Sequence, residues 1–229
     1  MTDPPRLTPQ IDARPDDVPW PAASWPVAPG IVLRGRTVEL RPYAPSDAPP
    51  LFAALDHDAV WQHVAGRPAD TAGLEAMLGT RNDDPAWQVW TVRLTEGLGE
   101  LPAGAVVGTT SYLETDPGAA RTEIGATMYA PAVWATRVNP ECKLLLLGLA
   151  FDELHMGRVQ LQTDVRNARS QQAIARLGAS LEGVLRRHKR RQDGSMRDSV
   201  LFSVIAEDWP RVRSGLEDRL AAPSTASGR

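Results

Sequence analysis

Cysteine and long apolar runs are scarce in this chain. Cys142 is the only cysteine among 229 residues, so no internal disulfide can form and a secreted, disulfide-stapled scaffold is excluded. No apolar run approaches the roughly 18 residues of a membrane-spanning helix, and the N-terminus lacks the basic and apolar segments of a signal peptide. We therefore expect a cytoplasmic protein with no membrane partner.

A large excess of charge and a metal-ligand spacing are also missing. The net charge of −3 gives no electrostatic case for nucleic acid as a partner. The basic run "RRHKRR" at 186–191 falls on an expected strand, where side chains alternate between faces, so we interpret it as part of a solvated hairpin. The four histidines show no ligand spacing, and we predict no metal.

The composition predicts one globular domain with an N-terminal arm. With 42% hydrophobic and 23% charged residues, the chain can bury one substantial core. Residues 1–32 form a Pro- and Trp-rich arm, whose second half should pack extended on the domain while residues 1–15 fray. The domain is expected over 33–213, and 214–229 should hold the end of a C-terminal helix and a disordered tail.

Periodicity from residue 37 onward indicates a mixed α/β sheet. We expect a helix opening with Asn139 as its N-cap, and a last hairpin turning at Asp193 and Gly194. Strands are expected at 37–43, 86–94, 105–113, 121–130, 158–165, 181–192 and 195–205, and helices near 51–56, 72–78, 139–156 and 167–177.

The segment "TDVRNARSQQAIARLGA" at 163–179 runs from a strand into a short helix. Asn167 is a good N-cap. Ser170 lies at helical spacing with Ile174 and Leu177 on the inward side, where a hydroxyl needs a partner. From these residues alone, capping with an internally bonded serine and a ligand site are equally favoured.

The order of three motifs carries a family resemblance. "EIGATM" at 123–128, "DVRNARSQQAIARLGA" at 164–179 and "EGVLRRH" at 182–188 together resemble the GNAT N-acetyltransferases, and within them the RimJ/RimL type, over about residues 33–212. The resemblance implies the GNAT acyl-CoA N-acyltransferase fold: a central mixed, mostly antiparallel twisted sheet, splayed between the strands at 121–130 and 158–165 and flanked by helices. It also implies acetyl-CoA as the cosubstrate.

The loop that would bind the pyrophosphate of coenzyme A departs from the family's usual glycine pattern. It reads "WATRVNPECK" at 134–143, with Arg137 and Asn139 where small residues are common. Thr136, Asn139 and Lys143 match a Thr-x-x-Asn-Pro-Glu-x-Lys version of this loop. The resemblance implies that the helix start and the residues Thr136, Arg137, Asn139 and Lys143 bind the pyrophosphate. The alternative is that Asn139 only caps and Lys143 is solvated.

The resemblance also implies where the chemistry occurs. The oxyanion donor would be a backbone N–H near Met128. Glu123 is the candidate base, on a strand face that it should share with Gly125 and Thr127. The alternative is a structural carboxylate, bonded to a neighbouring strand or to an arginine at position 41 or 121.

The common tyrosine acid is absent. Ile174 occupies that position, seven residues after Asn167. In the RimJ/RimL pattern, Ser170 approaches the sulfur of the leaving thiolate, and Asn167 holds the pantetheine amide.

We therefore expect transfer of an acetyl group from acetyl-CoA to a primary amine, either a protein N-terminal α-amine or a small molecule. The alternatives are an antibiotic or polyamine acetylase, or a non-catalytic acyl-CoA-binding regulatory module. A nucleic-acid-binding protein is the least favoured. The acceptor's identity, and whether the protein is a monomer or a homodimer, do not follow from the sequence.

Overall fold

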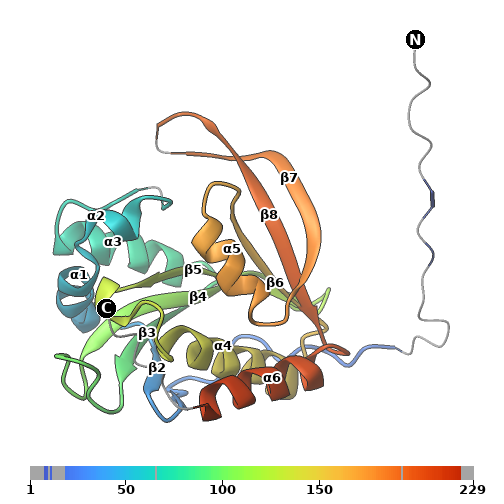
Figure 1. Ribbon diagram of the computed structural model, residues 1–229, viewed down its shortest axis with the longest axis horizontal. Coiled ribbons are helices and arrows are strands. Elements are labelled where there is room, and N and C mark those ends of the chain that lie inside the picture. Colours follow the sequence, from blue (N-terminus) through green and yellow to red (C-terminus); the bar gives the residue numbers. More distant parts are fainter. Residues whose placement is uncertain (1–7, 10, 12–18, 65, 192, 223–229) are drawn as a thin grey trace.

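One sheet organises the molecule. The computed structural model describes residues 8–9, 11, 19–64, 66–191 and 193–222. In these residues eight strands follow the order β1-β2-β3-β4-β5-β6-β8-β7, and only the β5–β6 pair is parallel (Figure 1). The strands are β1 (Leu33–Arg34), β2 (Val38–Pro42), β3 (Gln88–Leu94), β4 (Val106–Asp116), β5 (Arg121–Tyr129), β6 (Arg158–Asp164), β7 (Ser180–Arg190) and β8 (Met196–Ile205).

The helices follow the predicted order, with a one-turn helix added, and a C-terminal helix is present as expected. They are α1 (Ala48–Leu55), α2 (Asp58–Trp61), α3 (Thr71–Asn82), α4 (Val138–Gly148), α5 (Ala168–Ala175) and α6 (Trp209–Ala221), with short 3-10 turns η1 (Pro45–Asp47) and η2 (Pro131–Val133) and a π-helical turn η3 (Leu149–Glu153). The predicted mixed α/β fold with a mostly antiparallel sheet is confirmed.

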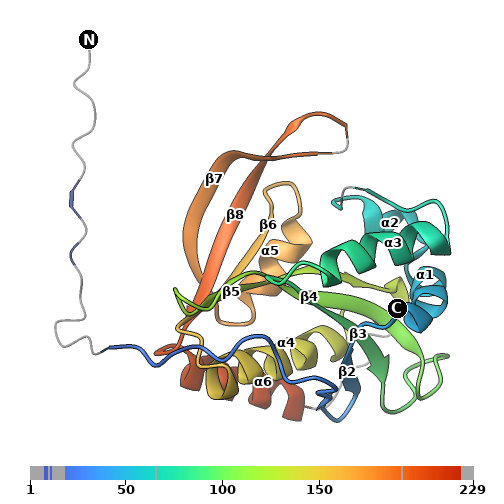
Figure 2. The ribbon, with the colours of Figure 1, turned by 180° about the vertical axis from the view of Figure 1, so that it is seen from behind.

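Helices cover the two faces of the sheet separately. Leu51 of α1 and Leu74 of α3 pack with Met128 on one face. Leu146 of α4 packs with Ile124 on the other, where α6 and α5 add their apolar sides. Figure 2 shows α1–α3 grouped away from α4 and α6, while the β7–β8 hairpin extends beyond both layers. The apolar middle of α4 is buried because it lies between the sheet and α6.

The described part of the N-terminal arm packs on the domain. The indole N–H of Trp20 donates to the carbonyl of His155 (2.8 Å), and that of Trp25 donates to the carbonyl of Pro85 (2.8 Å). Val27 is buried. The expectations for most of residues 1–15 and for the tail after Pro223 lie outside the described residues. Helix α6 crosses the predicted boundary at residue 213.

Helix α4 begins two residues earlier than predicted. Its N-cap is Arg137, whose side chain makes no capping bond, so the predicted capping by Asn139 is wrong. The helix start is held instead by Glu141, whose carboxylate accepts the backbone N–H groups of residues 36–38 at 2.6, 2.8 and 3.1 Å. This contact ties the first turn of α4 to the turn before β2.

Strands β5 and β6 separate after three paired positions. Their register runs from Arg121 opposite Arg158 to Glu123 opposite Gln160 and ends there. Further along β5 the register with β4 shifts, and Ala126 adopts a left-handed φ of 46°. This β-bulge bends the strand as it leaves its partner. The splay expected between these two strands is therefore present.

Candidate active site

Glu123 lies at the point where β5 and β6 part. Its side chain is buried, and its Oε2 accepts hydrogen bonds from the amides of Gln162 (2.6 Å) and Gln160 (3.0 Å). Its Oε1 accepts none from the described residues and points over Gly125, where an added Cβ would lie 2.8 Å from it. One carboxylate oxygen is thus fixed while the other is available.

The surroundings of Glu123 favour its protonated form. Burial raises the pKa of the Glu123 carboxyl above its ordinary value, and the donors on Gln162 and Gln160 oppose this shift. Of the two contacts expected of a structural carboxylate, the bond to a neighbouring strand is present, through Gln160 and Gln162 of β6. The bond to an arginine is not, since Arg41 pairs with Glu39 and Arg121 with Asp116. Glu123 can therefore exchange a proton closer to neutral pH than an ordinary carboxylate.

The bulge at Ala126 moves Thr127 to the opposite face. Glu123 and Gly125 share a face, as strand alternation predicts. The extra residue reverses the alternation, so Thr127 joins Thr110 on the α4 side, with 2.7 Å between the two hydroxyls. The expectation that Thr127 shares the face of Glu123 is wrong, because it assumes a regular strand.

Lys143 points into the sheet. Its side chain is 5% exposed, and its ammonium donates to the hydroxyls of Thr127 (2.9 Å) and Thr110 (3.4 Å). Burial lowers the pKa of Lys143 to about 8. The expected contact with a pyrophosphate at the helix start would require the ammonium to leave both hydroxyls. In this structure it lies behind the bulge instead.

The backbone of Met128 faces β4. The N–H of Ala130 donates to the carbonyl of Val107 (2.8 Å), and hydrogen-bonded pairs alternate along an antiparallel ladder. The pair Thr109–Met128, two residues earlier, is therefore a hydrogen-bonded pair as well. The stretch of β5 whose ladder is interrupted is the bulge, one or two residues before Met128.

The other three residues of the predicted pyrophosphate loop lie around the start of α4. Thr136 donates its hydroxyl to the carbonyl of Val133 (2.7 Å), and the same oxygen accepts the N–H of Val138 (3.3 Å). Arg137 donates to the carbonyl of Ala222 after α6 (2.6 Å). The half-buried Asn139 makes no side-chain hydrogen bond within the described residues. Among the three, only the Asn139 side chain is uncommitted.

The start of α5 reaches across to the loop before α4. Asn167 caps α5 by accepting the backbone N–H of Ser170 (3.0 Å), which confirms the predicted cap. The guanidinium of Arg169 lies 3.7 Å from the ring centre of Trp134. The half-buried Ser170 hydroxyl has no partner among the described residues. The capping contact therefore uses the serine's backbone and leaves its hydroxyl for another group.

The two glutamines that hold Glu123 were not predicted. Gln160 and Gln162 stand two residues apart in "RVQLQTD", so they share one face of β6. Two amide side chains on one face of a strand indicate that this face borders a polar group. That sign gains meaning only once the register places Gln160 opposite Glu123.

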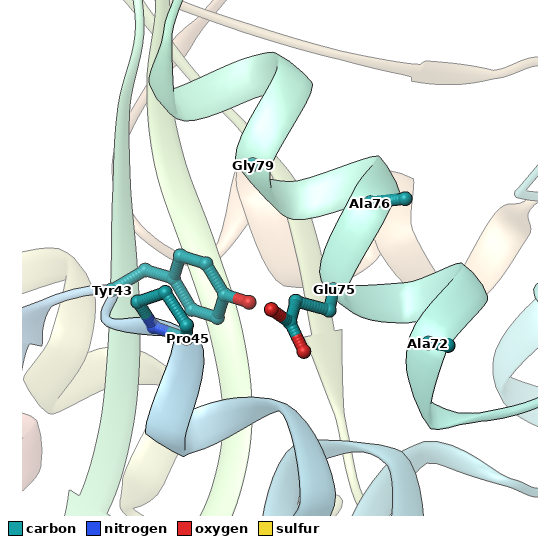
Figure 3. Close-up of a pocket in the computed structure, with 6 residues that line it drawn as sticks. All are labelled: Tyr43, Pro45, Ala72, Glu75, Ala76 and Gly79. Atoms are coloured by element: carbon teal, nitrogen blue, oxygen red, sulfur yellow. The ribbon is translucent and has the colours of Figure 1, made fainter.

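A separate cavity of about 370 Å³ lies between α3 and the segment after β2 (Figure 3). It is lined by Tyr43, Pro45, Ala72, Glu75, Ala76 and Gly79. Tyr43 bonds to Val89, which pairs with Ser111, which in turn pairs with Gly125. Three strand spacings of about 4.8 Å place this cavity roughly 14 Å from the β5 site. None of the predicted site residues lines it.

Two other features of the described residues bear on function. No helix among them has the length and apolar character to cross a membrane. No cluster of three or more histidine, cysteine, aspartate or glutamate side chains in the described ranges could hold a metal ion.

Comparison with known proteins gives consistent matches. A family model described as an acetyltransferase (GNAT) domain matches residues 37–180. A protein from T. thermophilus assigned as an acetyltransferase is 35% identical, with a TM-score of 0.75 over 86% of this chain and 100% of its own. A GCN5-related N-acetyltransferase from Brucella melitensis is 25% identical, with a TM-score of 0.78 over 89% of this chain and 92% of its own.

Similarity to the RimL subtype is limited to the fold. RimL, a ribosomal L7/L12 alpha-N-protein acetyltransferase, has a TM-score of 0.66 over 77% of this chain and 94% of its own, at 15% identity. No curated protein matches the chain in sequence.

Proposed function

The chain belongs to the GNAT acetyltransferase family, and on this premise we propose that it transfers the acetyl group of acetyl-CoA to a primary amine. The observation that carries the proposal is Glu123: a buried carboxylate with one oxygen fixed by two glutamines and the other free at the splay. An attacking amine must lose a proton. A carboxyl with a raised pKa can accept it, directly or through one water.

The bonds change in one displacement. The amine nitrogen attacks the thioester carbonyl, a C–N bond forms, and the C–S bond breaks. Charge that develops on the carbonyl oxygen needs a donor, and we assign this donor to the bulge at Ala126 and Thr127 rather than to Met128. Lys143 stands behind the bulge, where it holds the Thr127 hydroxyl and adds a positive charge.

Two groups serve the departing coenzyme A. The Ser170 hydroxyl is free to donate to the thiolate, and the Asn167 side chain can hold the pantetheine amide while it caps α5. At the start of α4 the N–H of Asn139 has no partner among the described residues, because Val138 donates to Thr136, Pro140 has no N–H and Glu141 donates to the carbonyl of Arg137. We place the pyrophosphate beside this N–H and the uncommitted Asn139 side chain, with Thr136 and Arg137 near.

The acceptor is a small-molecule amine or, as for the RimJ/RimL type, a protein N-terminal α-amine. The three uncommitted groups described above (the free oxygen of Glu123 and the side chains of Ser170 and Asn139) favour an active enzyme over a non-catalytic acyl-CoA-binding module, because binding alone needs neither a base nor a proton donor.

Release of free thiol from acetyl-CoA against a panel of amines and N-terminal peptides tests the proposal. Glu123→Gln should lower turnover by about 10²- to 10⁴-fold near pH 7 and by less at high pH, where the amine is already neutral. Glu217→Gln, an exposed carboxylate on α6, is the matched control and should change nothing. A deficit that does not vary with pH would make Glu123 structural. Binding of acetyl-CoA without turnover on any amine would favour the binding module.

A further inference from the structure

Two buried polar atoms near Glu123 have no partner among the described residues. They are Oε1 of Gln162 and Nε of Arg197. The carboxylate of Glu123 must receive the NH₂ end of Gln162, and this fixes the amide's oxygen on the other side. The unpartnered oxygen therefore stands beside the base as a hydrogen-bond acceptor, and Arg197 contributes an unpaired donor. Buried polar groups are rarely left unpaired without a reason.

The sheet register places both groups on the face of Glu123. Glu123 pairs with Gln160, and Gln162 follows on the same side of β6. Gln162 pairs with Leu201 of β8, and Asp164 with Ser199. Arg197 stands two residues before Ser199, so its side chain leaves β8 on this same face. Ile174 of α5 and Leu177 after it pack on the opposite face.

Arg197 forms no ion pair with a described residue, whereas two other cations of this hairpin do. Arg191 makes two bonds to Asp164, at 2.6 and 2.8 Å. Lys189, the register partner of Arg197, lies 3.8 Å from Glu114. The guanidinium of Arg197 makes no hydrogen bond or ion pair with any described residue.

The remaining groups near Arg197 do not supply a partner. His188 faces Ser199 at 3.1 Å. Burial lowers the pKa of Arg197, while the charges of Asp164 and Glu123 act in the opposite direction and that of Arg191 adds to the lowering. A half-buried guanidinium that has lost part of its water is stabilised by a carboxylate, which it binds through two parallel N–H groups.

We propose that the acceptor is an amino acid in the broad sense, a small molecule with an amine and a carboxylate, and that Arg197 binds the carboxylate while Glu123 and Gln162 bind the amine. This rests on the acetyl transfer proposed above. Oε1 of Glu123 and Oε1 of Gln162 both accept N–H groups, which suits a primary amine. The guanidinium on β8 suits an anion carried by the same molecule several bonds away.

Matched acceptors test the proposal in the unaltered enzyme. We would compare kcat/KM for glycine and methylamine, for 4-aminobutyrate and propylamine, and for 6-aminohexanoate and pentylamine, each with acetyl-CoA. The carboxylate should raise kcat/KM by about 10- to 100-fold for at least one chain length, the range expected of a charge-assisted contact. Equal values at every length, with turnover present, would overturn the proposal and leave acetyl transfer standing. No turnover with any amine would instead reject the proposed function and this inference with it.

Variants of Arg197 test whether this residue causes the preference for acceptors that carry a carboxylate. Arg197→Met should reduce the ratio of kcat/KM between each amino acid and its matched plain amine to about one, while Arg197→Lys should restore part of that ratio. Arg186→Met, which removes an exposed arginine of β7, is the control and should keep the full preference. A preference that survives Arg197→Met would overturn the assignment of Arg197 as the carboxylate-binding residue. Thermal melting of each variant separates a loss of folding from a loss of binding.

Discussion

Replacing Lys143 with methionine tests whether its ammonium is buried against the sheet or reaches solvent, because the two cases differ in their effect on stability. Methionine has a similar length and no charge. In the structure, the ammonium is buried against two threonine hydroxyls, and burial lowers its pKa to about 8, from an ordinary value of 10.5. At about 1.4 kcal/mol for each pKa unit, keeping the charge folded at pH 7 costs about 3 kcal/mol. Methionine has no charge to bury, so the variant should be more stable than the native protein at pH 7, by up to about 3 kcal/mol.

The pH dependence gives the sharper expectation. Between pH 8 and 10.5 the unfolded chain still holds the proton of Lys143 while the folded protein has released it. The stability of the native protein, relative to the variant, therefore rises with pH by about 3 kcal/mol across this window. Cys142, whose pKa burial raises to about 12, acts in the opposite direction in both proteins. Its contribution cancels in the difference except for the lowering of its pKa by the Lys143 charge, which the variant lacks.

Urea unfolding followed by tryptophan fluorescence at pH 7, 8, 9 and 10 measures this difference. The chain has one other lysine, Lys189, which is partly exposed. Lys189→Met is thus the control and should give a difference that does not vary with pH. A flat difference for Lys143→Met as well would refute the reasoning. It would mean that the ammonium reaches solvent, as a contact with a pyrophosphate requires.

Three further substitutions test single contacts. Ser170→Ala should leave acetyl-CoA affinity within a few-fold in calorimetry and lower single-turnover rates by about 10²- to 10⁴-fold, with the melting temperature unchanged because the cap uses the backbone; a less stable enzyme at full rate would contradict this. Gly125→Ala places a Cβ 2.8 Å from Oε1 of Glu123, so kcat should fall by at least tenfold, and an unchanged kcat would show that this oxygen is not used. Tyr43→Phe removes a buried hydroxyl without a partner, so unfolding in urea should show a gain of up to about 1 kcal/mol, whereas a loss of that size would reveal a partner.

Alternation and turn chemistry carry most of the fold, because each strand has one face against a core and each turn holds residues that favour it. The hairpin at Asp193 and Gly194 is an example, with Gly194 at a φ of 81°. The alternation of apolar and polar residues along a strand does not reveal a β-bulge that interrupts the strand. The sequence "EIGATM" does not predict the left-handed conformation of Ala126, and this conformation determines the face on which Thr127 lies.

The candidate site was predicted best where one residue acts locally. The cap by Asn167 needs only the next few residues. Lys143 was harder, because its direction depends on where α4 begins, and Glu141 sets that start through the turn before β2, about a hundred residues away in the chain. Gln160 and Arg197 are polar residues on strands, and only the register shows that they face Glu123.

The single cysteine bears on whether the acetyl group could be transferred through a covalent enzyme intermediate. A two-step transfer through the enzyme needs a nucleophile that can reach the thioester. Cys142 is fully buried on α4, and its pKa of about 12 keeps it protonated, so it is inert toward a thioester in solution. The bulge meanwhile separates the two sides of β5, with Glu123 and Gln162 on one face and Lys143 with Thr127 on the other. In the acetyl transfer proposed above, an amine on the Glu123 face and a thioester in the gap would meet directly, with both substrates bound at once.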